Sequence, residues 1–402
     1  MVTKLLKLKN FRRFFLSEIF YCFAIGMGTI GANWVLIDKT GSAQLVGLLL
    51  TVNVLAGFFA SPIIGVLTDR FNRKALLLTL YTIQILLLII LAVLMILNDF
   101  YVFFVFFFSI INGLGWTTYM ATSRSLMQEL LTEEQYVEGN AIVEISLQVG
   151  MFTAGAASGV LYEMIGFGWL IMLNATVIFI SGMCLAGIRY DPIATYDSPA
   201  SFVQDFRDGI FYLKKEYWLL IFGIASILPS VSTMLFNVVL PSYVTDVIKG
   251  NSVIFGLSDM FYGVGGFMSG FIAIRIIRKI SYRMAILCTF LLIMLILGSL
   301  VFNENAWILY GICLLYGFGN SSLRIWMNTR IMESVPKTYI GRAIAVWTAI
   351  SLLLQAVLSV GVGRLIDQTS ANLGFACLVT VMALGLSLAV YSDRQERLSE
   401  KT

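Results

Sequence analysis

The residues of this chain that could carry chemistry are charged side chains embedded in long apolar segments. Three of them are acids, Glu18, Glu144 and Asp259, and one is a base, Arg324. A charge within a membrane span costs about 2.5–3.5 kcal/mol on insertion scales and by default marks a functional site. The chain has no histidine, so proton transfer inside it must use carboxylates. We expect Asp259, Glu144 and Glu18 to be the proton-coupling sites.

These charged residues are not equivalent. Asp259 is the strongest coupling candidate because it is least able to reach water, whereas Glu18 could simply lie at the membrane interface. Arg324 could bind an anionic or carbonyl-rich substrate, or it could form a salt bridge between helices. Both interpretations remain open from the sequence.

The composition indicates a membrane protein. Of 402 residues, 59% are hydrophobic and 12% are charged, whereas soluble domains carry about 25% charged residues. The apolar residues form blocks long enough to cross a bilayer, and because no strict alternation runs through them they favour helices over a barrel. The twelve blocks lie at about 14–37, 44–67, 75–97, 101–125, 138–162, 168–188, 217–240, 253–277, 284–302, 306–329, 342–364 and 371–392.

The basic residues predict the orientation of these spans. If both termini are cytoplasmic, the inner loops and tails contain 22 of the 27 lysines and arginines. This bias fixes the termini inside, and it accounts for the net charge of +4 without nucleic-acid binding. We therefore expect a multi-pass protein of the cell membrane that acts as a monomer. We expect it to use a proton gradient and no cofactor. No P-loop and no HExxH motif occur, so an enzyme is not expected.

The chain divides into two similar halves. Thr29 and Asn33 recur as Thr233 and Asn237, 204 residues later, and further glycine matches share nearly the same offset. A duplicated six-helix unit is typical of secondary transporters. We predict an N-terminal half at 1–188, a cytoplasmic linker at 189–216 with a short helix on the membrane surface, and a C-terminal half at 217–402.

One loop carries the most specific motif. Residues 65–74 read GVLTDRFNRK, which resembles the G-x-L-x-D-R-x-G-R-K signature of the major facilitator superfamily, with Asn72 in place of a glycine. The resemblance implies an all-α membrane protein of twelve transmembrane helices in two pseudo-symmetric halves. It also implies a conformational latch at the inner side of the membrane. We assign this latch to Gly65, Asp69, Arg73, Arg124 and Glu129.

In that superfamily the first, fourth, seventh and tenth helices line a central cavity. Here all four carry polar residues at helical spacing. The predicted substrate pathway contains Thr29, Asn33, Trp116, Tyr119, Ser230, Thr233, Asn237, Asn320 and Arg324.

The short tails and the Asn10–Arg13 segment resemble the exporter branch that contains macrolide pumps and enterobactin-type siderophore exporters. The leading hypothesis is proton-coupled export, by alternating access, of a small amphipathic metabolite, with Arg324 favouring an anionic one such as a siderophore. A multidrug or macrolide efflux pump is the first alternative, and a lipid flippase is the alternative from another class. No single residue indicates the direction of transport.

Overall fold

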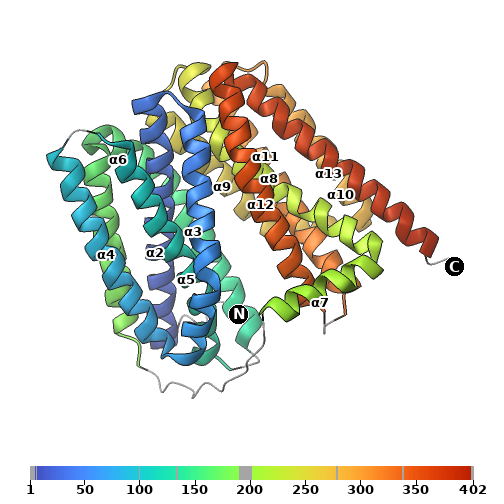
Figure 1. Ribbon diagram of the computed structural model, residues 1–402, viewed down its shortest axis with the longest axis horizontal. Helices are drawn as coiled ribbons and strands as arrows, with labels where there is room; N and C mark the ends of the chain where they lie inside the picture. Colours follow the sequence, from blue (N-terminus) through green and yellow to red (C-terminus); the bar gives the residue numbers. More distant parts are fainter. Residues whose placement is uncertain are drawn as a thin grey trace. The chain divides into compact units, whose positions relative to one another are not determined.

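The computed structural model is entirely helical in the part of the chain that it describes, which comprises residues 5, 7–98, 100–132, 135–189, 202–277, 279–336 and 339–399. Figure 1 shows its helices, α2 to α13. The first five are α2 (Lys9–Thr40), α3 (Ala43–Arg70), α4 (Arg73–Leu97), α5 (Val102–Leu130) and α6 (Tyr136–Ala186). A short helix, α7 (Phe202–Lys215), precedes α8 (Tyr217–Asp246), α9 (Ser252–Ile277), α10 (Tyr282–Ser299), α11 (Ala306–Ser334), α12 (Ile340–Gln368) and α13 (Ala371–Ser399).

The membrane-spanning pattern follows the expected apolar blocks. Ten of the described helices are long and apolar enough to cross a bilayer. The fifth and sixth expected spans both lie within α6, and they are separated at Gly166, where the backbone leaves helical geometry with φ at 73°. Glycine adopts this conformation without steric cost, so the chain can turn there and start a second span. The tenth expected span is α11, a helix of 29 residues that is not among the ten.

The described chain clusters into two compact units. The first contains Met1–Thr40, Val52–Ser198 and Gly250–Met260, and the second contains Gly41–Thr51, Pro199–Lys249 and Phe261–Thr402. In the first unit α2 packs along α6, and α4 also lies beside α6 (Figure 1). In the second unit α8 packs against α13 and α12, and α10 lies against α11 and α13. The first turns of α3 and α9 thus cluster apart from the remainder of those helices.

Equivalent helix contacts recur inside the two units. In the first, a Cβ built on Gly113 would lie 2.2 Å from the Asn53 carbonyl oxygen, and in the second a Cβ on Gly317 would lie 2.0 Å from that of Tyr262. Gly113 and Gly317 are 204 residues apart, and Asn53 and Tyr262 are 209 apart. Only glycine permits such close backbone approach, so the repeat seen in the sequence is also a repeat of packing.

A carboxylate from a neighbouring helix binds the start of α3 and of α9. In the second unit Asp367, in α12, accepts bonds from Ser42 Oγ at 2.6 Å and from the backbone N–H of Ala43 at 2.6 Å and of Gln44 at 3.2 Å. In the first unit Glu163, in α6, accepts a bond of 2.8 Å from Ser252 Oγ. Both carboxylates lie at helix N-termini, where negative charge is favoured.

The linker helix α7 docks on the start of α12. The rings of Tyr212 and Tyr339 stack with centroids 4.6 Å apart, and a Cβ on Gly209 would lie 2.6 Å from the Arg342 carbonyl oxygen. The helix expected in the linker is therefore present, with one side against α12.

Candidate functional site

A buried carboxylate forms the polar centre of the first unit. Glu18 is 2% exposed and lies more than two turns inside α2. Its carboxylate accepts hydrogen bonds from Tyr119 Oη at 2.5 Å and from Ser123 Oγ at 2.9 Å, both in α5. Glu18, for which the sequence left an interface position open, is therefore enclosed by protein, and α5 supplies two donors that compensate its burial.

Aromatic and polar side chains surround this carboxylate. Tyr119 also contacts Cys22 Sγ at 3.2 Å, and the Trp116 ring lies 5.7 Å from the Tyr119 ring. The Tyr21 ring stands 4.6 Å from that of Tyr119, while its hydroxyl donates to Gln84 at 3.1 Å. Tyr119, which was predicted to contact substrate, thus donates a hydrogen bond to Glu18.

Arg124 and Glu144 form an ion pair in the first unit. Arg124 Nη2 lies 3.7 Å from Glu144 Oε2, and the Glu144 side chain is 55% exposed. The protein therefore does not enclose the Glu144 carboxylate, which lies beside a guanidinium, and its coupling role stays a prediction. Arg124, which we assigned to the inner latch, pairs here with a coupling candidate.

Asp259 is the second embedded acid of the first unit. It lies in the first half of α9, and its Oδ2 would be 3.1 Å from a Cβ on Gly155 in α6. Within the described ranges no hydrogen bond or ion pair joins the Asp259 side chain. A buried charge without a partner is costly, and protonation removes that cost.

The glycine-rich face of α6 positions these groups. Gly155 and Gly159 bring α6 against the first turns of α9, since Cβ atoms on them would lie 2.9 Å from the Gly256 carbonyl oxygen and 2.3 Å from that of Ser252. Gly150 packs in the same way on α2, 2.6 Å from Cys22 Cβ. The stripe is required for packing, whatever the substrate.

Arg324 lines a cavity of about 380 Å³ in the second unit. The side chain is exposed in this cavity, and within the described part of the chain it makes no hydrogen bond or ion pair. The salt bridge that the sequence left open for Arg324 is therefore absent among these residues. The cavity is walled by α8, α11 and α12, and its other lining residues are Ser226, Ile227, Ser230, Asn328, Ile331, Met332, Ile344, Trp347, Thr348, Ser351, Leu352 and Gln355.

The lining of this cavity is rich in hydrogen-bond donors and contains no carboxylate. Besides the guanidinium it offers the hydroxyls of Ser230 and Thr348 and the amide of Asn328. The Trp347 indole N–H is not among these donors, because it is buried against Gly223 of α8. An anion with several acceptor atoms would satisfy such a lining, and a cation would not.

The remaining pathway candidates lie outside this cavity. Thr233 and Asn320 bind each other at 3.2 Å, and Asn320 also donates to the Pro229 carbonyl at 3.0 Å, so both serve helix packing. Thr29 accepts a bond of 2.8 Å from Asn112. Asn33 is buried, with its Oδ1 lacking a partner in the described part of the chain. Asn237 is half-buried.

The polar residues of α12 were missed by the sequence analysis. Ser351 and Gln355 face the cavity and bond each other at 2.8 Å. Their spacing of four residues places both on one face of an apolar helix, and this pattern could have predicted a polar face. The cavity was expected to be lined by four other helices, so α12 was not considered.

The predicted inner latch is partly visible. Arg73 Nη1 lies 2.7 Å from Glu129 Oε1, with the two side chains 17% and 3% exposed. Among the described residues, no atom lies within 4 Å of a Cβ built on Gly65, and the close helix approach expected there stays a prediction. The Asp69 side chain lies outside the described residues. The latch role of these groups remains a prediction.

The whole-chain comparisons agree with this architecture. The model of the Major Facilitator Superfamily matches residues 14–359. A variant of the nucleoside transporter NupG superposes with a TM-score of 0.76 at 13% identity, covering 96% of this chain and 99% of that one. A bacterial homologue of the human lysosomal transporter Spinster, in an inward-facing and unoccupied conformation, gives 0.75 at 13% identity, covering 96% and 98%.

At this identity the two structures establish the fold alone. The comparison with curated proteins found no match. The family match covers most of the sequence and includes both units described above. The chain therefore belongs to the major facilitator superfamily, and it is a multi-pass membrane protein that acts as a secondary transporter of a small molecule.

Proposed function

We propose that this transporter exports a small amphipathic anion in exchange for protons. The observation that supports the proposal most directly is Arg324, exposed in a donor-rich cavity whose lining contains no carboxylate. A guanidinium can hold a carboxylate or phosphate through two parallel N–H···O bonds, which a cationic drug cannot accept.

The rest of the lining fits the apolar part of such a substrate. Ile227, Met332 and Leu352 share the cavity with Arg324. Ligand sites of this kind combine an apolar wall with a few polar groups that fix orientation, and the volume of about 380 Å³ lies within their usual range of about 300–1,000 Å³. A polycarboxylate siderophore, or a part of one, has the required chemistry.

We assign proton coupling to Glu18 and Asp259, with Glu144 acting through Arg124. Glu18 is held by two hydroxyl donors that can follow a change in its protonation, since hydroxyls donate or accept. Asp259 is half-buried and has no hydrogen-bond or ion-pair partner within the described ranges, so protonation would offset the cost of its charge. Both acids belong to the first unit, whereas Arg324 belongs to the second.

Efflux from proteoliposomes carrying Arg324→Lys and Arg324→Ala tests the substrate class. A citrate-type polycarboxylate siderophore and the cationic dye ethidium serve as probes. For the siderophore, Arg324→Ala should weaken binding by about 2 kcal/mol, or roughly 30-fold, because charge-assisted bonds are lost. Arg324→Lys should have a smaller effect, since an ammonium keeps the charge but loses the fork.

Arg275→Ala is the matched control, because Arg275 is an exposed base in the last turn of α9, outside the cavity. It should leave both probes unchanged. If ethidium export depends on Arg324 and siderophore export does not, the drug-pump alternative replaces the anion proposal.

A further inference from the structure

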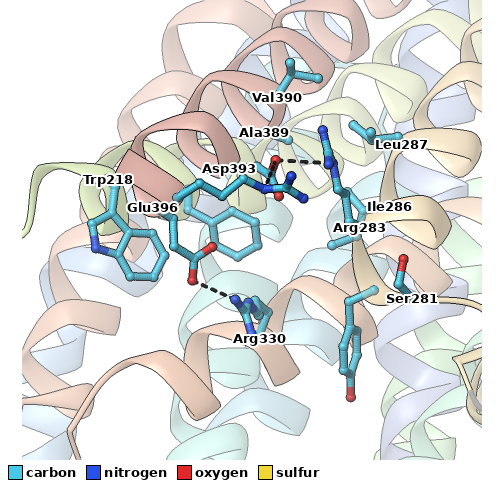
Figure 2. A pocket seen from close by; sticks show the side chains of 13 residues that line it. Trp218, Ser281, Arg283, Ile286, Leu287, Arg330, Ala389, Val390, Asp393 and Glu396 are labelled. Carbon is cyan, nitrogen blue, oxygen red and sulfur yellow. Dashed lines mark hydrogen bonds and ion pairs between the residues drawn. The ribbon is translucent and has the colours of Figure 1, made fainter. Parts of the chain in front are cut away.

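A second cavity lies in the second unit, away from Arg324. It has a volume of about 370 Å³ and is lined by the ends of α8, α10, α11 and α13 that carry the basic loops (Figure 2). Its charged residues are Arg283, Arg330, Arg397, Asp393 and Glu396. Nothing in the proposed transport cycle uses this cavity.

Three guanidiniums share two carboxylates here. Arg283 Nε lies 3.2 Å and Arg397 Nε 3.4 Å from the same Asp393 oxygen, Oδ2. Arg330 Nη2 donates to Glu396 Oε1 at 2.6 Å. Figure 2 shows Arg283 turned toward Asp393, and Arg330 turned toward Glu396. With both acids ionised, the lining keeps one positive charge in excess.

The contacts with Asp393 leave the ends of two guanidiniums available. Arg283 and Arg397 both use Nε, and within the described residues their Nη atoms make no hydrogen bond or ion pair. Their side chains are 45% and 57% exposed. Two neighbouring guanidiniums with exposed Nη atoms can together hold a phosphate, which accepts several N–H bonds at once.

A second part of the lining is apolar and lies about one turn from Arg283 in α10 and from Asp393 in α13. Phe222, Ile286, Leu287, Ala389 and Val390 form this part. Further along α10 and α13, large apolar side chains are exposed on the protein surface, among them Leu291, Leu295 and Leu384. A ligand that meets the arginines can therefore extend an acyl chain along these helices.

We propose that this cavity binds the phosphate of an anionic phospholipid, with Arg283 and Arg397 as the phosphate ligands. Basic pockets between membrane helices at the cytoplasmic side bind acidic headgroups, and the sequence predicts that these helix ends are cytoplasmic. The exposed guanidiniums of Arg283 and Arg397 favour a headgroup with a net negative charge over a zwitterionic one. Free inorganic phosphate offers the same chemistry without the acyl chains.

Native mass spectrometry of the purified full chain tests this. We expect dioleoylphosphatidylglycerol to bind at least 10-fold more tightly than dioleoylphosphatidylcholine, and the double variant Arg283→Lys/Arg397→Lys to lose that preference. The lysines keep the positive charge and can still pair with Asp393, but they lack the two Nη groups with which a guanidinium binds phosphate. Arg275→Lys, an exposed base at the same helix ends, is the control and should bind phosphatidylglycerol normally.

A second variant separates lipid binding from a purely structural ion-pair network. Asp393→Asn removes a negative charge from the lining, so phosphatidylglycerol binding should be retained or strengthened. Stabilisation by inorganic phosphate that is lost in the double variant, without a lipid preference, would support the phosphate site and assign it to free phosphate. Unchanged phosphatidylglycerol binding in the double variant, or loss of binding in Asp393→Asn, would overturn the proposal.

Discussion

The cap that Asp367 places on α3 gives a prediction whose size can be worked from the structure. Its carboxylate accepts hydrogen bonds from the backbone N–H groups of Ala43 and Gln44 and from the hydroxyl of Ser42. Loss of a side-chain helix cap costs about 1 kcal/mol, and loss of a negative charge at a helix N-terminus costs about 0.3–1 kcal/mol more. Asp367→Ala should therefore lower the free energy of opening the first turns of α3 by about 1.5–2 kcal/mol.

Hydrogen exchange measures this opening at the amides concerned. A loss of about 1.5–2 kcal/mol corresponds to roughly 10–30-fold faster exchange. We expect this acceleration in peptides covering residues 43–51, where Gly47 also packs on the Ser359 carbonyl. Asp367→Asn should have a smaller effect, because asparagine is also a good cap.

Glu163→Ala is the matched control for Asp367. Glu163 accepts a bond from Ser252 at the start of α9, in the other unit. It should accelerate exchange at the start of α9 and leave residues 43–51 unchanged. Equal exchange of residues 43–51 in Asp367→Ala and the parent protein would refute the argument that this carboxylate holds α3.

Three further substitutions address coupling and stability. Glu18→Gln should uncouple export from the proton gradient. Its thermal unfolding midpoint should fall only slightly, because glutamine still accepts a hydrogen bond from Tyr119 or Ser123. A gradient-dependent export rate equal to that of the wild type would exclude Glu18 as a coupling residue. Asp259→Asn should abolish proton-driven efflux yet permit substrate exchange without a gradient, as measured by counterflow. Arg73→Ala should destabilise the protein by about 3 kcal/mol, because it leaves the carboxylate of Glu129 buried and unpaired, and Arg73→Ala/Glu129→Ala should recover part of that loss in thermal unfolding.

The fold could be predicted from the sequence because bilayer length and backbone hydrogen bonding leave few solutions. Each long apolar block had to become a helix. The Arg73–Glu129 pair was also predictable, since the signature loop places the arginine and the fourth span places the acid. The break between the fifth and sixth spans was predictable too, since the expected blocks end at 162 and begin at 168, and the backbone leaves helical geometry between them at Gly166.

The site was harder to predict because burial depends on neighbours. Glu18 near the start of an apolar block resembles an interfacial residue until Tyr119 and Ser123 of another helix are placed against it. Glu144 shows the reverse, since a carboxylate two turns into an expected span is not enclosed by protein and lies beside Arg124. Periodicity reports which face of one helix is polar, but not what the next helix brings to that face.

The internal repeat conserves packing while its chemistry diverges. The glycine contacts Gly113–Asn53 and Gly317–Tyr262 are equivalent in the two units. At the same offset, however, Glu18 corresponds to Phe222, and Arg324 corresponds to Met120. Helix contacts made by backbone are hard to change after duplication, because any added side chain meets a carbonyl. Side chains on open faces are free to change, so an acid could specialise for protons in one unit and an arginine for the substrate in the other.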